Sequence, residues 1–147
     1  MAIEVGQEAP DFTLVNEANE PVHLAELRGS PVVLVFFPFA FSGICTAENC
    51  EIRDNYSGWQ ANGAKVLGIS RDSRFVQAKF KEQEHFTHSL LADVKGDVAK
   101  AYGVFNENVG VAERATIVID RDGRVVFTMH NNIPDRRDFS TVEEYLK

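Results

Sequence analysis

The chain has 147 residues, of which 44% are hydrophobic and eleven are phenylalanine, so it can bury a core without disulfide bonds. We therefore expect a single domain over residues 1–147. The net charge of -7, without any cluster of Lys and Arg, argues against a nucleic acid partner, because phosphate backbones are bound through clustered basic side chains.

Membrane insertion is also not expected. The longest apolar run is shorter than the roughly 20 residues that a membrane-spanning helix requires, and the first residues show no basic stretch followed by an apolar one. We therefore expect a cytoplasmic location. In that reducing compartment the two cysteines would have catalytic, redox-sensing, metal-binding or inert roles rather than the role of a structural disulfide.

The sequence pattern of the N-terminal part predicts β-strands. Residues 9–24 alternate apolar and polar side chains on either side of a polar stretch, which predicts a β-hairpin of two short edge strands. Residues 32–37 are apolar throughout and rich in β-branched and aromatic side chains, which predicts a central strand buried on both faces. Pro38 ends this strand.

The middle of the chain alternates helical and strand patterns. Residues 43–62 carry apolar side chains at helical spacing, with Ser42 as a candidate N-cap, and a strand is expected at 64–70. The alternation continues with a helix at 75–81 after a capping loop at 71–73, a strand at 90–92 and a helix at 96–102.

The C-terminal part adds a hairpin and a last helix. Residues 115–120 and 124–130 flank an Asp-Gly pair, which is a strong hairpin signal. Residues 140–143 have the pattern of a capping box and predict a helix that runs to Lys147. We therefore predict an α/β fold, in which helices flank a mixed central β-sheet and an N-terminal β-hairpin is added.

Both cysteines follow the central strand, where ligands of such sheets tend to bind. If Ser42 caps the helix, Cys45 lies in the first turn, near backbone N–H groups that have no partner in the helix and favour a thiolate. Lowering a thiol pKa from about 8.5 to about 6 takes roughly 3.4 kcal/mol, whereas a helix terminus supplies at most about 2 kcal/mol. A fixed cation is therefore needed nearby, and an arginine suits this role.

Pro38, Ser42 and Cys45 form the motif Pro-x-x-x-Ser-x-x-Cys. With this motif the chain resembles the peroxiredoxins, which are thiol-dependent peroxidases on a thioredoxin-like fold. The resemblance covers nearly the whole chain, including residues 9–14, 32–38, 102–105 and 114–123. Residues 36–45 and 102–107 are most similar to the AhpE branch, whereas residues 45–50 are similar to the bacterioferritin-comigratory branch, also called PrxQ.

The resemblance implies a role for each residue of the site. Cys45 matches the peroxidatic cysteine, Pro38 the proline that shields it, and Ser42 the Thr or Ser whose hydroxyl contacts the peroxide. Arg114 matches the arginine that stabilises the thiolate and the transition state, and Glu48 an acidic residue that orients this arginine. Taken alone, Arg114 could instead be a surface charge or an ion-pair partner, especially beside Glu113, and Glu48 a solvated acid in the first turn of the helix.

Cys50 allows two interpretations. The PrxQ-like pattern implies a resolving cysteine that forms an intramolecular disulfide with Cys45. Five residues of an intact helix advance about 7.5 Å and turn about 140°, which separates the two Cα atoms by roughly 8.6 Å, beyond the 7 Å or so that a disulfide tolerates. The disulfide therefore requires the first helical turns to unwind, which Gly43 would ease. In the AhpE-like pattern Cys50 is a small buried residue, and an external thiol reduces Cys45.

We predict a peroxidase that reduces hydrogen peroxide and organic hydroperoxides through a Cys45 sulfenic acid, without metal or organic cofactor. The expected reductant is a thioredoxin-like, glutaredoxin-like or mycoredoxin-like protein, and the expected state is a monomer or a homodimer. Two alternatives remain: a disulfide oxidoreductase, which the missing Cys-x-x-Cys motif argues against, and a redox-sensing or chaperone-like binding protein that uses Cys45 as a switch. Phe39, Phe41 and Phe105 are expected in the core, and the alternative is that they line the peroxide pocket or a dimer face.

Overall fold

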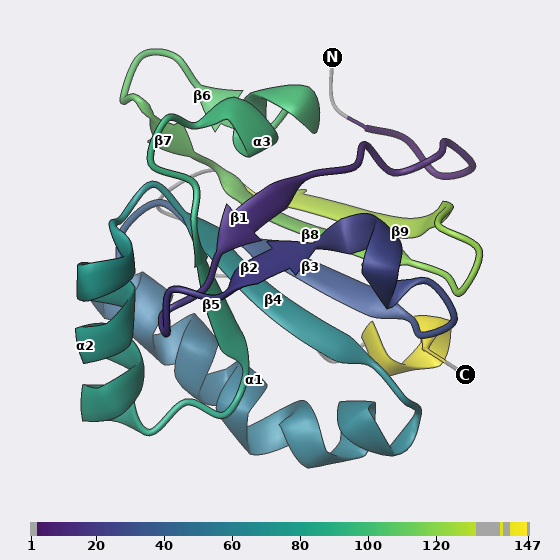
Figure 1. Ribbon diagram of the computed structural model, residues 1–147, viewed down its shortest axis with the longest axis horizontal. Coiled ribbons are helices and arrows are strands. Elements are labelled where there is room, and N and C mark those ends of the chain that lie inside the picture. The colour runs from purple at the N-terminus through teal and green to yellow at the C-terminus, as the bar shows by residue number, and fades with distance from the viewer. Residues whose placement is uncertain (1–2, 132–138, 140–141, 147) are drawn as a thin grey trace.

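The computed structural model describes residues 3–131, 139 and 142–146, and at 44, 45, 57 and 143 it describes the backbone alone. The central sheet of this part has five strands in the order β5-β4-β3-β8-β9 (Figure 1). The first three strands of that order are parallel to one another, and the last two join antiparallel, so the predicted mixed sheet is confirmed. Its strands are β3 (Val32–Phe36), β4 (Lys65–Ser70), β5 (Ser89–Ala92), β8 (Arg114–Ile119) and β9 (Val125–Asn131).

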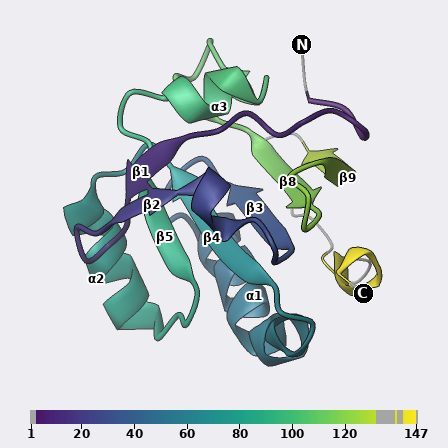
Figure 2. The same cartoon turned by 45° about the vertical axis from the view of Figure 1, so that its right-hand side comes forward.

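Two long helices cover one face of this sheet. Helix α1 (Gly43–Ala61) connects β3 to β4, and α2 (Arg74–Glu84) connects β4 to β5, so right-handed crossovers bring both to the same face. The other face carries the predicted N-terminal hairpin, β1 (Thr13–Val15) with β2 (Pro21–His23), and the short helix α3 (Asp97–Ala101). Figure 2 shows the sheet between these two layers.

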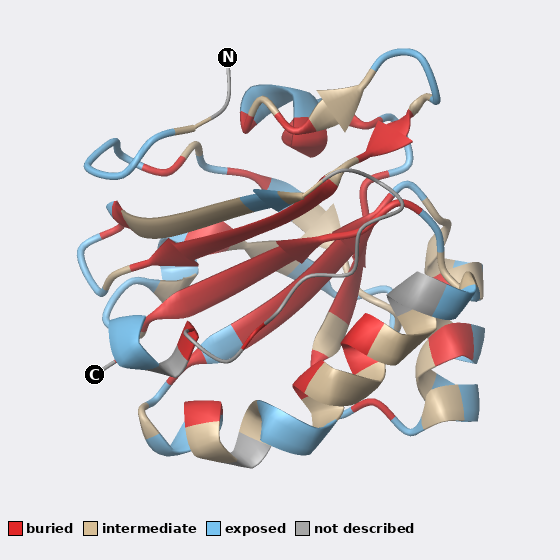
Figure 3. Ribbon diagram, turned by 180° about the vertical axis from the view of Figure 1, so that it is seen from behind, coloured by how far each residue is buried: buried red, intermediate tan, exposed pale blue. Residues whose placement is uncertain are grey.

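The alternation of strand side chains explains the two layers. Val32, Leu34 and Phe36 belong to the cluster beneath α3 and the hairpin, whereas Val33 and Val35 pack with side chains of α1. All five are at most 2% exposed, which accounts for the uninterrupted apolar run of β3. The central strands accordingly form the buried band of Figure 3.

Some short elements differ from the prediction. The two-residue strands β6 (Phe105–Asn106) and β7 (Val111–Ala112) and the 3-10 helix η1 (Leu24–Leu27) were not predicted, since segments this short carry no measurable periodicity. The expected C-terminal helix is a short 3-10 helix in the described residues, η2 (Val142–Tyr145), and Val142 and Leu146 pack against the α1 side of the sheet. Residues 140, 141 and 147 of that prediction lie outside the described residues. None of the helices in the described ranges has the length and apolar character needed to cross a membrane.

Candidate active site

The sheet topology brings residues far apart in sequence to one edge. Strand β8 runs antiparallel to β3 with Phe36 opposite Ala115, so Arg114, the residue before Ala115, lies at the carboxyl end of β3. Pro38 and the loop to α1 start from that same end, and Pro38 is buried. The predicted cation and the predicted cysteine loop are therefore neighbours through strand pairing.

A buried ion pair links β8 to α1. Arg114 Nη1 donates to Glu48 Oε1 across 2.7 Å, and the two side chains are only 3% and 1% exposed. The interpretations of Arg114 as a surface charge and of Glu48 as a solvated acid are therefore wrong. A charge-assisted bond of this length fixes the guanidinium in place, which is the preorganisation that thiolate stabilisation needs.

The start of α1 places Cys45 as the sequence predicts. The Ser42 carbonyl accepts the Thr46 N–H at 2.8 Å, so Ser42 directly precedes the helix and position 45 lies in its first turn. Position 45 comes three residues before Glu48, and residues at this spacing share one face of a helix. Glu48, which binds the Arg114 guanidinium, therefore shares a face of α1 with position 45.

The loop between β3 and α1 carries aromatic side chains at the surface. Phe39 and Phe41 are each 44% exposed, so their expected core position is wrong, whereas Phe105 is half-buried and packs against the core. Phe41 has a φ of +67°, in the left-handed region, and its ring lies 4.9 Å from the ring of Phe80. Phe39 and Phe41 thus form an apolar rim beside the predicted site rather than part of the core.

Cys50 lies one turn and a half further along α1, which is intact from residue 43 to residue 61. Its Sγ donates a hydrogen bond to Glu84 Oε1 at 3.7 Å, at the end of α2, and it packs against the cluster that contains Phe37 and Phe80. Burial and the neighbouring Glu84 carboxylate raise the pKa of the Cys50 thiol. In the closed helix Cys50 is therefore a protonated thiol.

A buried polar pair attaches the same helix to β5. His88 Nε2 and Asn49 Oδ1 are 3.0 Å apart, and both side chains are fully buried. Burial, with a smaller contribution from Lys81, lowers the pKa of His88 to about 3, so the imidazole is neutral. Its Nδ1 atom has no hydrogen-bond partner among the residues that the structure describes.

Three polar residues near the site were not found from the sequence. Glu84, which contacts Cys50, ends α2. Asp72, which accepts the backbone N–H of Ala40 in the cysteine loop, lies two residues before α2 begins. His88 is the third. Asp72 follows the carboxyl end of β4, and that position is a usable signal, because functional side chains of such sheets gather at strand ends. Glu84 and His88 carry no comparable local signal.

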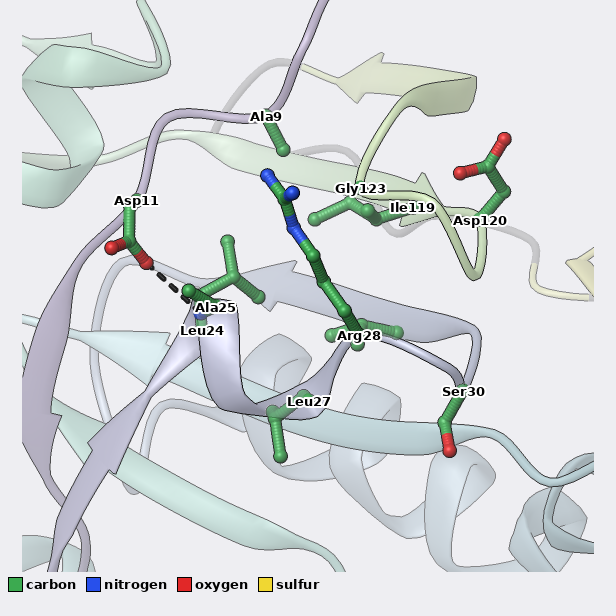
Figure 4. A pocket seen from close by; sticks show the side chains of 11 residues that line it. Ala9, Asp11, Leu24, Ala25, Leu27, Arg28, Ser30, Ile119, Asp120 and Gly123 are labelled. Atoms are coloured by element: carbon green, nitrogen blue, oxygen red, sulfur yellow. Dashed lines mark hydrogen bonds between the residues drawn. The ribbon is translucent and has the colours of Figure 1, made fainter.

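A small pocket among the described residues lies away from the cysteine loop (Figure 4). Ser30 and Val32 line it, at the amino end of β3, whereas the cysteine loop leaves the carboxyl end. Its volume of about 20 Å³ holds roughly one water molecule. The Arg28 side chain crosses it over Gly123 and pairs with Glu8 at 3.0 Å. The described residues contain no group of three or more metal-ligating side chains.

Comparisons with known proteins agree with this geometry. The model of the AhpC/TSA family matches residues 5–128. Alkyl hydroperoxide reductase E of Mycobacterium tuberculosis is 40% identical over 139 residues, which cover 92% of this chain and 91% of the relative. Peroxiredoxin Bcp of Bacillus subtilis is 35% identical over 133 residues, which cover 86% and 84%. The crystal structure of peroxidoxin BcpB from M. tuberculosis superposes with a TM-score of 0.87 at 33% identity, covering 98% of this chain and 94% of the other.

The chain belongs to the AhpC/TSA family of peroxiredoxins. It is a thiol-dependent peroxidase on a thioredoxin-like fold, which takes a peroxide as substrate and a thiol as reductant. Membership of this enzyme family argues against a disulfide oxidoreductase and against a redox-sensing binding protein as the primary function. Relatives of both predicted branches are present, so the family alone does not assign the role of Cys50.

Proposed function

We propose that Cys45 is the peroxidatic cysteine and that Arg114 is the cation that activates it. The observation that carries this proposal is the buried Arg114–Glu48 ion pair on the face of α1 that includes position 45. The helix terminus and a fixed guanidinium together supply the stabilisation that neither provides alone. Glu48 is the residue that orients Arg114.

The reaction is a nucleophilic displacement on oxygen. The Cys45 thiolate attacks one peroxide oxygen, an S–O bond forms as the O–O bond breaks, and the leaving oxygen takes a proton to depart as water or an alcohol. Negative charge moves from sulfur to the leaving oxygen, where Arg114, the Ser42 hydroxyl and the N–H groups at the start of α1 would stabilise it. Pro38 shields the resulting sulfenic acid from bulk water.

The substrate class is hydrogen peroxide together with organic hydroperoxides. The apolar rim of Phe39 and Phe41 beside the loop offers contact surface for an alkyl chain. The similarity to a relative named alkyl hydroperoxide reductase E supports the organic substrates.

For recycling we propose that Cys50 is the resolving cysteine. Its thiol condenses with the Cys45 sulfenic acid, which forms the disulfide and releases water, and a thioredoxin-like, glutaredoxin-like or mycoredoxin-like dithiol then reduces that disulfide. Because both cysteines lie in one helix with Cα atoms roughly 8.6 Å apart, the first turns of α1 must open before the bond can form.

The environment of Cys50 favours a second mechanism, in which Cys45 is the one reactive cysteine. In the closed helix the Cys50 thiol is half-buried, bonded to Glu84 and raised in pKa, which suits a structural residue. In this one-cysteine mechanism an external thiol reduces Cys45 directly.

Mass spectrometry under non-reducing conditions separates the two mechanisms. The reduced protein is mixed with one equivalent of peroxide, alkylated and weighed, beside the Cys45→Ser and Cys50→Ser variants. We expect a loss of two hydrogens in the native protein and a sulfenic acid in Cys50→Ser. A persistent sulfenic acid in the native protein would assign the one-cysteine mechanism, and oxidation that survives in Cys45→Ser would refute the role of Cys45.

We further propose that residues 1–147 act as one domain, in the cytoplasm, where reducing thiols are available. The assembly is a monomer or a homodimer. Sedimentation at micromolar and millimolar concentration, for the reduced and the oxidised protein, decides between these states.

A further inference from the structure

The loop between β3 and α1 is attached to a distant carboxylate. Asp72 lies in the connection between β4 and α2, and its Oδ2 accepts the backbone N–H of Ala40 at 2.8 Å. Ala40 sits between Phe39 and Phe41, two residues before Ser42. A charged acceptor on a backbone N–H makes a stronger bond than a neutral one, so this contact is well suited to hold the loop.

Two buried side chains hold Asp72 in turn. The Ser70 hydroxyl donates to Asp72 Oδ2 at 2.6 Å, and Gln77 Nε2 donates both to Ser70 Oγ at 2.8 Å and to the Leu91 carbonyl at 3.0 Å. Ser70 and Gln77 are 1% and 0% exposed. The Ser70 hydroxyl accepts from the Gln77 amide, so its one proton is donated to Asp72. Gln77 and Ser70 therefore hold the Asp72 carboxylate that accepts the Ala40 N–H of the loop.

The loop needs external support because its backbone is strained. Phe41 adopts a φ of +67°, a conformation that a bulky L-residue rarely takes unless its surroundings hold it. Two contacts flank this residue: the Ala40–Asp72 bond before it, and the packing of its own ring on Phe80 of α2. The strained residue directly precedes Ser42, whose carbonyl starts the hydrogen-bond ladder of α1.

We infer that Asp72 is a positioning residue for peroxide reduction, which acts by fixing the Ala40 peptide and so holds Ser42 and the start of α1 in their reactive places. The inference rests on the proposed role of Cys45. Asp72 stabilises the loop conformation that is observed here, so its loss should slow the oxidation of Cys45. The later disulfide step requires this loop and the first turns of α1 to open, so that step should be unchanged or faster. A loss of overall stability would not divide the two steps in this way.

The test uses the full chain with Asp72→Ala, the milder Asp72→Asn, and Ser70→Ala, which removes the donor that orients the carboxylate. Asp122→Ala is the matched control, an exposed aspartate in the hairpin between β8 and β9. Two quantities are measured: hydrogen exchange of the Ala40 amide, and the rate constants of Cys45 oxidation and disulfide formation from rapid quench and alkylation.

We expect the Ala40 amide to lose protection and Cys45 oxidation to slow by about ten- to a hundredfold in Asp72→Ala, with smaller effects in Asp72→Asn and Ser70→Ala and none in Asp122→Ala. Unchanged protection, or lost protection with an unchanged oxidation rate, would overturn the inference. Should Asp72→Ala not fold, the same comparison is made on Asp72→Asn. A native protein that reacts no faster than free cysteine would instead refute the proposed function, which distinguishes the two failures.

Discussion

Arg114 and Glu48 are the residues on which the proposed chemistry depends most. Each is almost fully buried, and each is the partner of the other at 2.7 Å. A buried ion pair of this kind contributes little net stability compared with apolar residues of the same size, yet removing one partner leaves the other charge unpaired. The pair is therefore better explained by the need for a fixed cation at the start of α1 than by stability.

Replacing Arg114 tests this directly. Arg114→Ala should slow Cys45 oxidation by about 10² to 10³, because one oriented charge donor to the transition state is lost. It should also lower the free energy of unfolding by about 3 to 5 kcal/mol, because the buried Glu48 carboxylate loses its ion pair with Arg114. Rapid mixing with peroxide and denaturant unfolding measure the two effects. Arg114→Lys keeps the positive charge beside Glu48 and so disturbs folding less than Arg114→Ala. In this variant we expect the rate of Cys45 oxidation to fall at least tenfold.

The Cys50 thiol gives a prediction about pH. Burial and Glu84 raise its pKa, so at neutral pH the folded protein holds it as a thiol, and its thiolate appears only as the pH rises above the ordinary range for cysteine. In a Cys45→Ser background, Glu84→Gln should shift the midpoint of Cys50 alkylation to lower pH, because the nearby negative charge is gone. Glu82→Gln, an exposed glutamate on the same helix, should leave the midpoint in place. An unchanged midpoint in Glu84→Gln would show that burial alone sets the pKa.

At the scale of elements, α1 has two opposing tasks. While its first turns are helical, α1 supports the proposed Cys45 thiolate. In that same helical state Cys50 is too far from Cys45 to form a disulfide. The polar contacts of α1 come from α2, β5 and β8: Cys50 and Arg53 bind Glu84, Asn49 binds His88, and Glu48 binds Arg114. All of these contacts come from residue 48 onward, so opening residues 43–46 breaks none of them.

Gly43 at the start of α1 makes that opening measurable. A Cβ at this position would meet no atom within 4 Å, so Gly43→Ala fits the closed helix and should stabilise it by about 0.5 to 1 kcal/mol. Disulfide formation should then slow about two- to fivefold, while Cys45 oxidation stays near the native rate. Asn55→Ala, an exposed substitution in the later turns of α1, is the control and should change neither step. Equal slowing of both steps in Gly43→Ala would contradict the opening mechanism.

Local patterns predict the long elements of this fold well and its long-range contacts poorly. The helix expected at 43–62 is observed at Gly43–Ala61, and the strand expected at 32–37 at Val32–Phe36, because periodicity and chain breakers act over neighbouring residues. Arg114 was placed by resemblance to a family, since nothing local connects it to a residue 66 positions away. Asp72 was missed for the same reason, because its partner Ala40 lies 32 positions earlier.

The surface positions of Phe39 and Phe41 show another limit. Aromatic residues after a buried strand are usually core, and the sequence carries no sign that a strained loop turns these two outward. Only the backbone conformation at Phe41 explains the difference.

At the scale of the whole molecule, buried His88 links stability to pH. Its pKa is about 3 in the folded chain and near 6.5 when unfolded, so between these values the unfolded state binds the extra proton. The free energy of unfolding is therefore unaffected by His88 above pH 6.5. As the pH falls from 6.5 toward 3, it decreases by up to about 1.4 kcal/mol per pH unit. His88→Gln should flatten the pH dependence of unfolding over this range. His85→Asn, at an exposed histidine, should not.

The central claim is that helix, loop and Arg114 together make Cys45 a peroxide-reactive thiolate, and the rate constant of Cys45 oxidation tests it most directly. The reduced protein is mixed rapidly with hydrogen peroxide at pH 7 beside free cysteine. Free cysteine is only about 3% thiolate at pH 7, so full ionisation of Cys45 gains up to about 30-fold, and oriented donors to the leaving oxygen add about 10² or more. We therefore expect oxidation more than about a thousandfold faster than that of free cysteine. A rate equal to that of free cysteine would contradict the account.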